Sequence, residues 1–595
     1  MGQTKHFVVI GASAAGLKAA SKARRRDVAM KITVFNKGTF ISYAACGLPY
    51  YVSGAVKKQE DLYSNLIGVP RTPQFFKKMK DLDILIHHEV TSIDRKNKTV
   101  SVTNLDTGEK FTTAYDKLLI ATGAEPVMPP IPGINLKNIH TLQSIEDAEA
   151  LRKLVGKGKK GVIVGGGFIG LEAAEALVER GVETTIVEKM EQIMLGLDYE
   201  MSVMVKRHLE SKGVDVRTSD GVVEFKGDNA GSLKQVVTEN AVVDADFAVM
   251  GLGVRPNVKL AKETGLELGT TRGIKVDEYM RTSDPDIYAA GDCVETHHIV
   301  SNKPVFIPLG STANKQGRIV GINVTGGRET FPGVVGTMIF KALDINVGRT
   351  GLTEREARAM GIDVETVIVP APDRAHYYPQ SKLIATKLIA EKKTGKLLGA
   401  QVVGMGVVDK RTNLFTALVT IGATAESLGN LDLSYAPPYS SPITPALTAI
   451  NVLRNKLSGE ARGISPLAVK EKLDKGEDFV FLDVRNQNEY DEVRIPRTTF
   501  IPLGELKGRM GELPKDKEII AFCKISLRGY EACNMLEPAG FKDTKFMDGG
   551  VVTWPFELVT GNGARQPAAT LTQENRMLSS STSANQENRP NPPGA

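Results

Sequence analysis

Two segments of the chain share one pattern of apolar and small residues. Residues 5–16 begin with the apolar run HFVVI and continue through a glycine-containing turn into a predicted helix. Residues 161–180, GVIVGGGFIGLEAAEALVER, repeat this plan about 155 positions later. A buried strand, a glycine turn and a helix form the unit that binds dinucleotides, so the pattern predicts two such sites in one chain.

The rest of the chain shows two further apolar patterns and a polar end. Residues 330–450 alternate apolar strands with a helical stretch, which is typical of an α+β domain. Residues 466–560 predict another small α/β unit, with FVFLDVR and EIIAFC as its buried strands. The polar stretch 455–465 predicts a linker. Residues 561–595 are rich in Ser, Asn, Pro and Gln and predict a disordered tail.

Composition and charge narrow the class of protein. Apolar residues make up 42% and charged residues 24% of the chain, and a net charge of +6 is too small to favour nucleic acid as a partner. The four cysteines are too few and too scattered for a disulfide framework or a zinc site, and they favour a reducing compartment. We find no leader pattern and no apolar run of about 18 residues, so we expect a cytoplasmic protein without a membrane span.

The first glycine turn reads Gly11-x-Ser13-x-x-Gly16. Gly11 permits the tight turn and Gly16 lets the helix pack close to the strand, so that free N–H groups of the helix face a pyrophosphate. Ser13 stands where a middle glycine is usual, and we expect slight crowding there. The acceptor at the end of the next strand is Asn36, which can hydrogen-bond a ribose hydroxyl without a charge.

The second turn has all three glycines, Gly165, Gly167 and Gly170. The strand that follows its helix ends at Glu188, whose carboxylate accepts from both ribose hydroxyls and repels a 2′-phosphate. The second site is therefore predicted to prefer NADH, with NADPH still possible because Lys189 stands next to the carboxylate.

Three more strand ends carry residues of the cofactor type. Thr122 and Gly123 lie in LLIATGAEP, and Gly253 lies in VMGLGVRPN, one turn for each nucleotide unit. Gly291 and Asp292 follow the strand of DIYAAGDC, where the carboxylate can bond the ribityl chain of a flavin.

In this order the motifs resemble the flavoproteins of the pyridine nucleotide-disulfide oxidoreductase superfamily over about residues 5–450. The resemblance implies FAD in the first unit, a nicotinamide cofactor in the second, and a C-terminal dimerisation domain that forms a homodimer.

A single cysteine, Cys46, lies in the segment SYAACGLPY after the first unit. One cysteine cannot close an internal disulfide, so it must store its oxidised state as a mixed disulfide, a persulfide or a sulfenic acid. The thiolate is the nucleophile, and we expect the nearby helix N-terminus and the flavin to lower its pKa. The segment resembles that of coenzyme A-disulfide reductases and persulfide-reducing relatives.

That resemblance implies further site residues. A tyrosine pair from the partner subunit would bond the cysteine sulfur, and Tyr377 and Tyr435 match it, with Tyr378 and Tyr439 as rivals. A serine and basic residues would bind coenzyme A. These positions are Ser42, Lys18, Lys22 and Arg25. The chain departs from the family pattern at Ala45, Ile443 and Thr444, which leaves room for another persulfide or polysulfide as substrate.

Residues 466–560 resemble a rhodanese domain, with Cys523 to Arg528 as its active loop. A cysteine at a strand end, wrapped by the following residues, receives several backbone N–H groups that stabilise a thiolate or persulfide. Arg528 would fix the loop or bind an anionic donor. Asp483, Arg485 and Glu489 match the ion-pair residues of the family.

These observations predict an α/β protein with two Rossmann-like domains, an α+β dimerisation domain and a C-terminal rhodanese domain. The predicted boundaries are 1–150 with 275–328 for FAD, 151–274 for NAD(P)H, 329–454 for dimerisation, 455–465 for the linker, 466–560 for rhodanese and 561–595 for the tail. The predicted activity is NAD(P)H-dependent reduction of small-molecule S–S bonds, in coenzyme A disulfide, coenzyme A persulfide or polysulfide, through Cys46, with Cys523 delivering sulfane sulfur. An NADH oxidase of the same fold and a rhodanese-type sulfurtransferase remain alternatives.

Overall fold

The first strand–turn–helix unit of the sequence builds a parallel sheet in the order β18-β7-β1-β2-β3. The computed structural model describes residues 5–561 and the strand 565–566. The strands read as unbroken apolar runs because both faces of the sheet are covered, and they form one core with the helices. The strands are β1 (His6–Ile10), β2 (Lys31–Asn36), β3 (Asp83–Ile86), β7 (Lys117–Ile120) and β18 (Ile287–Ala289).

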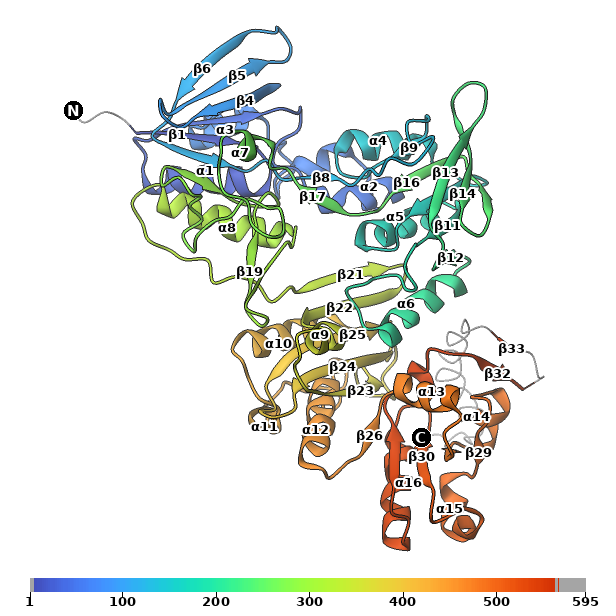
Figure 1. Ribbon diagram of the computed structural model, residues 1–595. Helices are drawn as coiled ribbons and strands as arrows, with labels where there is room; N and C mark the ends of the chain where they lie inside the picture. Colours follow the sequence, from blue (N-terminus) through green and yellow to red (C-terminus); the bar gives the residue numbers. More distant parts are fainter. Residues whose placement is uncertain (1–4, 562–564, 567–595) are drawn as a thin grey trace, which may run out of the picture. The chain divides into compact units, whose positions relative to one another are not determined.

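Helix α1 (Ala14–Arg26) packs very closely against α8 (Gly310–Asn323), although almost 300 residues separate them in sequence (Figure 1). Glycines on α8 make this contact possible. A Cβ on Gly317 would lie 2.3 Å from the Ala15 carbonyl oxygen, and a Cβ on Gly321 would lie 2.5 Å from that of Ala19. The close packing fixes the direction of α1, and therefore the direction of its N-terminus beside the first glycine turn.

The second strand–turn–helix unit of the sequence repeats the architecture, with parallel strands β11, β10, β16 and β9 lying in that order. Two of the turns that follow these sheets are joined by the antiparallel pair β8 (Ala124–Pro126) and β17 (Val254–Pro256). The two nucleotide units are therefore tied together by backbone hydrogen bonds. The other elements here are β9 (Ile139–His140), β10 (Lys160–Val164), β11 (Glu183–Val187), β16 (Phe247–Met250), α4 (Ile145–Leu154), α5 (Phe168–Glu179) and α7 (Lys259–Glu263).

Smaller antiparallel sheets and helices complete this part of the chain. One sheet has the order β4-β5-β6 and another the order β13-β14-β15, and β19 pairs with β20. Their bounds are β4 (His88–Asp94), β5 (Thr99–Asn104), β6 (Lys110–Ala114), β13 (Val222–Gly227), β14 (Leu233–Thr238), β15 (Val242–Asp244), β19 (Thr296–His298) and β20 (Lys303–Val305). The helices are α2 (Leu48–Ser53) and α3 (Pro73–Lys80).

The described residues divide into two compact units. The first unit runs to Lys189 and resumes from Asp220 to Val334, and it contains all the elements named so far. The second unit comprises Met190–Ser219 and the chain from Val335 onward.

An antiparallel sheet in the order β21-β22-β25-β24-β23 forms the first half of the second unit. Its central strands β24 and β25 are almost fully buried, which agrees with the predicted α+β domain. The strands are β21 (Met338–Ala342), β22 (Ile345–Gly351), β23 (Val364–Pro372), β24 (Leu383–Glu391) and β25 (Leu397–Gly404). The helices and the remaining strand are α6 (Tyr199–Ser211), α9 (Glu354–Ala359), α10 (Asp409–Thr420), α11 (Ala425–Leu428), α12 (Pro445–Ser458) and β12 (Asp215–Arg217).

The C-terminal α/β domain of this unit has a parallel sheet in the order β26-β31-β30-β27-β29. Its strands are β26 (Gly463–Ile464), β27 (Phe479–Asp483), β29 (Thr499–Phe500), β30 (Glu518–Phe522) and β31 (Thr544–Met547). Its helices are α13 (Pro466–Lys475), α14 (Gln487–Glu492), α15 (Leu503–Arg509) and α16 (Leu527–Leu536). A small sheet joins β28 (Val493–Arg494), β32 (Leu558–Thr560) and β33 (Arg565–Gln566).

The connection between the two halves of this unit is short. Within the stretch predicted as a linker, α12 continues to Ser458 and β26 already belongs to the C-terminal sheet. The tail predicted over 561–595 lies outside the described residues, apart from Gly561 and β33. Among the described helices, none combines the length and the apolar character that crossing a membrane requires.

Candidate active site

The first glycine turn has the backbone that the sequence predicted. Gly11 has a φ of +105°, and a Cβ there would lie 2.2 Å from the Ala121 carbonyl oxygen. A Cβ on Gly16 would lie 1.9 Å from the Gly11 carbonyl oxygen, so only glycine allows the helix to start here. Ser13 is the exposed N-cap of α1 and makes no side-chain capping bond. The N–H groups of the first turn therefore remain available to an anion.

Asn36 is bound to this turn. Its Oδ1 accepts from the Ala12 N–H at 3.2 Å, and its Nδ2 donates to the carbonyls of Gly38 and Phe40. Both amide hydrogens are thus used, and the second lone pair of Oδ1 is left for a ribose hydroxyl. At the second glycine turn Glu188 occupies the equivalent place, where its Oε2 accepts from the Gly166 N–H at 2.7 Å.

The second turn is tighter at its ends and open in its middle. Gly165 has a φ of +107°, and a Cβ on Gly170 would lie 2.0 Å from the Gly165 carbonyl oxygen. Gly167 has an ordinary φ of −84°, and a Cβ there would approach protein no closer than 4.0 Å, at Gly251. Protein packing does not demand glycine at Gly167, whereas a closely bound pyrophosphate would.

Two further turns, at Gly123 and Gly253, lie beside the two glycine turns described above, which we call the nucleotide cradles. Backbone hydrogen bonds join these two further turns to each other. A Cβ added to Gly123 (φ +69°) or to Gly253 (φ +83°) would meet nothing within 4 Å. The Asn257 N–H donates to the Gly123 carbonyl and the Val127 N–H to the Gly253 carbonyl, while Thr122 Oγ1 donates to the Asn257 carbonyl at 2.6 Å.

Asp292 is a carboxylate whose pKa is raised by burial and lowered by no group of the described chain. It follows Gly291, whose φ is +87° and whose N–H donates to Gln316 Oε1 at 2.8 Å. Burial alone raises the pKa of Asp292 to about 6, because no hydrogen-bond donor of the described chain offsets the loss of water. A hydroxyl-bearing ligand at this place would supply the missing bond, so the residues fit the ribityl chain of a flavin.

Cys46 is exposed on a 3-10 turn, Ala45–Gly47, directly before α2. The segment is bound to the first glycine turn, because the Ser42 N–H donates to the Ala12 carbonyl at 2.9 Å. A few residues later the Ala44 N–H donates to the Leu62 carbonyl. The first of these bonds ties the Cys46 segment to the glycine turn, and the second holds the segment against residues 59–63.

Within the described chain, only its own backbone N–H lowers the pKa of Cys46. Partial desolvation raises the pKa of the thiol although the residue is exposed at the surface, and the Glu172 and Asp292 carboxylates raise it further. The short helix α2 therefore does not make the thiolate by itself. Any lowering must come from a bound cofactor, a substrate or another subunit.

Glu172 was missed by the sequence analysis. It lies on α5, and α5 packs against α2, the helix that follows Cys46. Burial and the neighbouring Glu175 raise the pKa of Glu172 to about 7. Its only sequence signal is a carboxylate inside the apolar run FIGLEAAEAL. A carboxyl group that titrates near neutrality beside a redox thiol is the expected form of a proton-handling residue.

The basic residues predicted for coenzyme A lie on α1 and gain two partners from elsewhere in the first unit. Burial lowers the pKa of Lys80, and the positive charges of Arg25, Arg71 and Lys18 lower it further. These three cations therefore lie near Lys80. Arg71 Nη1 lies 3.4 Å from both the carbonyl and the Oγ of Ser42. Lys22 lies one turn beyond Lys18 on the same helix.

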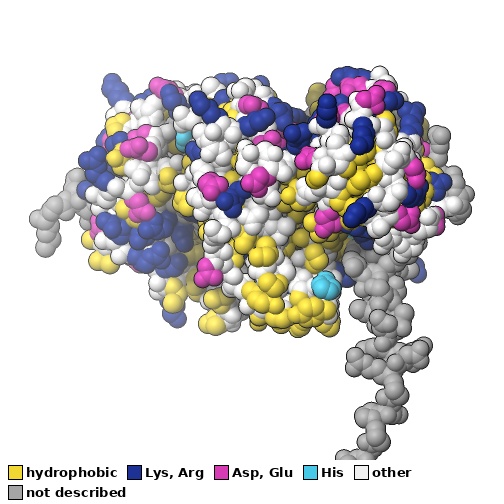
Figure 2. Space-filling model, turned by 90° about the horizontal axis from the view of Figure 1, so that it is seen from below, with side chains coloured by type: hydrophobic (Ala, Val, Ile, Leu, Met, Phe, Trp, Pro, Cys, Tyr) yellow, Lys and Arg dark blue, Asp and Glu magenta, His cyan; other side chains and the backbone are white. Residues whose placement is uncertain are grey.

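Figure 2 shows a dense group of Lys and Arg side chains on the face that it presents. The positive charge of Lys18, Arg25, Arg71 and Lys80, which reaches Ser42 through Arg71, suits a ligand with several phosphates. Arg71 and Lys80 could not be assigned from spacing, since they come from other elements than α1.

The two tyrosines predicted for the sulfur site come together in the second unit. Tyr377 and Tyr435 are hydrogen-bonded to each other, and their side chains are 62% and 47% exposed. Tyr439 is exposed as well and Tyr378 follows Tyr377 directly. Ile443 is exposed, and Thr444 caps α12 by accepting from the Leu447 N–H.

The C-terminal domain presents its cysteine as the sequence predicted. Cys523 is buried at the end of β30, and the loop after it leads to Ser526, the N-cap of α16 with a φ of +86°. No acceptor within the described residues takes the N–H groups of 524–529, and the buried Ser526 Oγ has no partner there either. Free donors in a loop that follows a cysteine are what a nest for a thiolate or persulfide requires.

Arg528 fixes this loop. Its guanidinium binds both carboxylate oxygens of Glu489, at 2.7 and 2.8 Å, and also bonds Cys523. Arg485 binds Asp483 in the same bidentate way and donates to the Glu489 carbonyl. The three predicted ion-pair residues are thereby confirmed, and Arg528 is already neutralised by a carboxylate.

The other two cysteines are buried in apolar surroundings. Burial raises the pKa of Cys293 to about 11 and that of Cys533 to about 12. They have the character of packed core residues.

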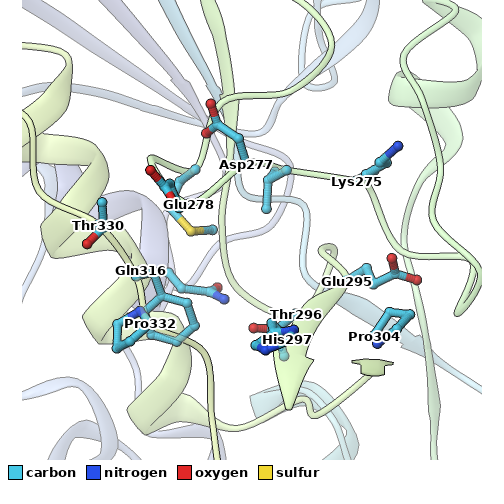
Figure 3. A pocket seen from close by; sticks show the side chains of 13 residues that line it. Lys275, Asp277, Glu278, Glu295, Thr296, His297, Pro304, Gln316, Thr330 and Pro332 are labelled. Atoms are coloured by element: carbon cyan, nitrogen blue, oxygen red, sulfur yellow. The ribbon is translucent and has the colours of Figure 1, made fainter. Parts of the chain in front are cut away.

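A separate pocket of about 420 Å³ lies in the first unit. Figure 3 shows its lining side chains, among them Asp277, Glu278, His297 and Gln316. None of the predicted cofactor or substrate residues lines it, and its connection to the site is Gln316, which also holds Gly291.

This chain belongs to the pyridine nucleotide-disulphide oxidoreductase family, whose model matches residues 5–317. The dimerisation domain of that family matches residues 337–447, and a rhodanese-like domain matches residues 465–555. The predicted fold is confirmed: two Rossmann-type domains, a dimerisation domain and a C-terminal rhodanese domain. Membership of the family implies FAD and a nicotinamide cofactor, and the two cradles fit both.

Three known proteins are similar over most of the chain. A solved NAD-dependent persulfide reductase from A. fulgidus is 44% identical, with a TM-score of 0.87, covering 92% of this chain and 100% of that one. Reduced Bacillus anthracis CoADR-RHD is 35% identical, with a TM-score of 0.87, covering 93% and 98%. The NAD(P)H coenzyme A polysulfide/persulfide reductase of Pyrococcus horikoshii is 34% identical over 453 residues, which cover 76% of this chain and 98% of that protein.

Proposed function

We propose that this enzyme reduces the S–S bond of coenzyme A persulfide, coenzyme A disulfide or polysulfide with NAD(P)H, and that its rhodanese domain supplies the sulfane sulfur. The observation that carries the proposal is the exposed Cys46, held by backbone bonds beside the first glycine turn in a chain that also carries Cys523 in a nest of N–H donors. The names of the similar proteins agree with this activity.

The cofactors are assigned to the two cradles. Gly11, Ser13 and Gly16 would hold the FAD pyrophosphate, Asn36 its adenosine ribose and Asp292 its ribityl chain. When bound, FAD supplies two-electron transfer from the nicotinamide to the sulfur of Cys46. The second cradle would hold the nicotinamide cofactor through Gly165, Gly167 and Gly170, with Glu188 favouring NADH over NADPH.

The sulfur chemistry of the C-terminal domain comes first in the proposed cycle. The Cys523 thiolate attacks a sulfane donor such as thiosulfate, taking one sulfur atom and releasing sulfite. The resulting persulfide anion is stabilised by the loop N–H groups. The thiol of coenzyme A then takes the sulfur, giving coenzyme A persulfide and restoring the Cys523 thiolate.

Reduction follows at Cys46. Its thiolate attacks the sulfur of the persulfide that is bonded to coenzyme A, which forms a mixed disulfide and releases HS⁻. Two electrons and one proton then return Cys46 to the thiolate and release free coenzyme A. The basic group around Lys18, Arg25, Arg71 and Lys80 would hold the phosphates of the substrate during both steps.

We also propose a homodimer, in which Tyr377 and Tyr435 of one subunit serve the cysteine of the other. Supporting this, the second unit exposes several large apolar side chains. They are Ile339, Tyr377, Ile421, Tyr435, Tyr439 and Ile443. Exposed aromatic and aliphatic side chains of this kind are typical of a protein interface.

The test is anaerobic NADH oxidation by the FAD-loaded protein against coenzyme A disulfide, coenzyme A persulfide, glutathione persulfide, polysulfide and oxygen. Cys46→Ser is expected to abolish reduction of every sulfur substrate while the flavin stays bound. Cys523→Ser is the matched control: it should abolish thiosulfate-to-cyanide sulfur transfer and leave coenzyme A disulfide reduction intact.

Each alternative activity has its own outcome in this experiment. Oxygen consumption that needs no sulfur substrate and dominates the panel would identify an NADH oxidase. Sulfur transfer without NADH, together with a flavin that NADH cannot bleach, would identify a sulfurtransferase. Unchanged turnover in Cys46→Ser would refute the proposal.

A further inference from the structure

Two buried basic side chains from outside the rhodanese domain bind residues 548–556, near the C-terminal end of that domain. Lys456 lies near the end of α12, and its Nζ contacts Asp548 Oδ2 at 2.9 Å, Glu365 Oε1 at 2.9 Å and the Thr366 carbonyl at 2.5 Å. Its side chain is 5% exposed. The bond to Asp548 joins the dimerisation domain directly to the segment that follows β31.

Arg207 on α6 makes the second contact with the same stretch of chain. It donates to the carbonyls of Trp554 and Phe556, at 2.6 and 3.0 Å, and its side chain is also buried. Its Nε has no acceptor within the described residues. Burial lowers the pKa of Arg207 to about 10. Both cations are taken out of water for a few carbonyl and carboxylate bonds, and removing one partner of such a contact would leave an uncompensated buried group.

The segment they hold, residues 548–556, is the one that supports the active loop. The Val551 N–H donates to the Cys523 carbonyl at 3.0 Å, and the Val552 N–H donates to the Lys524 carbonyl at 3.2 Å. Gly550, with a φ of +57°, fits so closely that a Cβ would lie 2.3 Å from the Cys523 carbonyl oxygen. A shift of the segment would therefore move the backbone of Cys523 itself.

Asp548 connects Lys456 to the segment that supports the Cys523 loop. It is fully buried, its Oδ2 binds Lys456, and its Oδ1 has no partner in the part of the chain that the structure describes. The space around it is closed, since a Cβ on Gly463 would lie 2.9 Å from Oδ1 and 3.0 Å from Lys456 Nζ. Without Lys456 the carboxylate would be a buried charge without a counterion, which the segment could relieve only by moving or by taking a proton.

We propose that Lys456 is a positioning residue for the sulfurtransferase site: through Asp548 it sets the segment 548–552 and thereby aims the N–H groups of the Cys523 loop. The inference rests on the proposed function, in which Cys523 carries sulfane sulfur. It adds that the rhodanese site is completed by an element of the dimerisation domain. Sulfur loading is then efficient only in a chain whose two halves are docked.

The pH dependence gives a signature that a merely structural contact would not have. The charged groups facing Asp548 are Lys456 on α12, Glu365 on β23 and Lys387 on β24. Burial raises the pKa of Asp548 to about 6, against the effect of Lys456. Below that pH the carboxyl group of Asp548 takes a proton and its ion pair with Lys456 is lost, so the rate of sulfur transfer should fall as the pH drops below about 6.

The experiment measures thiosulfate-to-cyanide transfer and coenzyme A disulfide reduction by the FAD-loaded full chain. Lys456→Met should lower kcat of sulfur transfer about tenfold or more, with a smaller effect on KM for thiosulfate, because the loop donors are misaligned by a fraction of an ångström. Lys456→Arg should recover most of the activity. Coenzyme A disulfide reduction should stay unchanged in both variants. The control Lys475→Met replaces an exposed lysine of the rhodanese domain and should change neither activity.

A second variant makes the result independent of the folding of Lys456→Met. Asp548→Asn keeps the shape and removes the charge, so it should reproduce the loss and abolish the acid limb near pH 6. The double variant should be no worse than either single variant. Normal sulfur transfer with an unchanged pH profile in Lys456→Met or Asp548→Asn, or losses that simply add in the double variant, would overturn the proposal.

Failure of the proposed function would show differently. If the wild-type protein transfers no sulfur at all, the rate of Cys523 alkylation by iodoacetamide still reports on the loop. The proposal expects that rate to fall in Lys456→Met and to return in Lys456→Arg. An alkylation rate unchanged by Lys456→Met would overturn it.

Discussion

Replacing Glu172 by Gln should make the protein more stable and its redox cysteine more reactive towards simple reagents, while reducing turnover. Glu172 is a half-buried carboxyl group on α5, and no basic side chain contributes to its pKa. Burial and Glu175 instead raise that pKa from 4.5 to about 7. The same carboxylate raises the pKa of Cys46. Glutamine keeps the shape of the side chain and removes the charge from both effects.

The magnitude follows from the pKa. The difference between 4.5 and about 7 corresponds to about 3 kcal/mol of unfavourable free energy when Glu172 is ionised in the folded protein. Screening by the remaining solvent reduces the measurable value to about 1–2 kcal/mol. Because the pKa in the folded state is raised, the folded protein holds the proton longer than the unfolded chain does. Wild-type stability should therefore fall as pH rises from about 4.5 to 7 and stay low above 7.

The assay is thermal unfolding of wild type and Glu172→Gln between pH 5 and 8.5. The variant should gain about 2–4 °C per kcal/mol at pH 8 and little at pH 5. Glu179→Gln, exposed at the end of the same helix, controls for helix propensity and should show no such pH-dependent gain. Iodoacetamide should alkylate Cys46 faster in Glu172→Gln at pH 7–8, since one cause of its raised pKa is gone. Equal stability of wild type and variant at pH 8, or an unchanged alkylation rate, would refute this account of Glu172.

Three further predictions concern the cradles and the loop. Gly167→Ala should leave the melting temperature unchanged, because the nearest protein atom to the new Cβ is 4.0 Å away. The Cβ would face the pyrophosphate, so KM for NADH should rise about tenfold, and a normal KM would count against the site. Glu188→Ala should raise kcat/KM with NADPH relative to NADH, measured by steady-state kinetics, and an unaltered ratio would show that this carboxylate does not select the cofactor. The pKa of Glu489 is lowered by Arg528 against burial, so the stability that the pair contributes, about 1–3 kcal/mol, should be fully present above about pH 4.5 and be lost progressively as the pH falls through the lowered pKa. Glu489→Gln should unfold at a lower temperature than wild type at pH 7, and the difference should shrink as the pH falls below about 4.5; parallel curves would contradict the assignment.

The nucleotide cradles and the rhodanese loop could be predicted from the sequence because their determinants are local. A turn such as the one at Gly165 is specified by a strand, a few glycines and a helix within one short stretch. The pairing of Asp483 with Arg485 is equally local, two residues apart. Patterns of this kind can be recognised in the sequence without any knowledge of tertiary contacts.

The residues that escaped prediction all depend on packing between distant elements. Glu172 has the sequence context of an ordinary apolar helix, and its place near Cys46 follows only from the contact of α5 with α2. Arg71 and Lys80 join Lys18 because separate elements meet around Ser42. The carboxylates that raise the pKa of Cys46 also come from distant parts of the chain, and no sequence pattern reveals which carboxylates will surround a thiol.

The ribbon of β8 and β17 has a consequence for how the reductase moves. It cross-links the loops at Gly123 and Gly253, and each of its hydrogen bonds is worth about 1 kcal/mol. Spreading the two nucleotide lobes apart would break this ladder with nothing to replace it. Opening of these lobes therefore costs the bonds of this ribbon, and we expect nicotinamide exchange to depend less on a hinge between the lobes than on local movement of side chains at the second glycine turn.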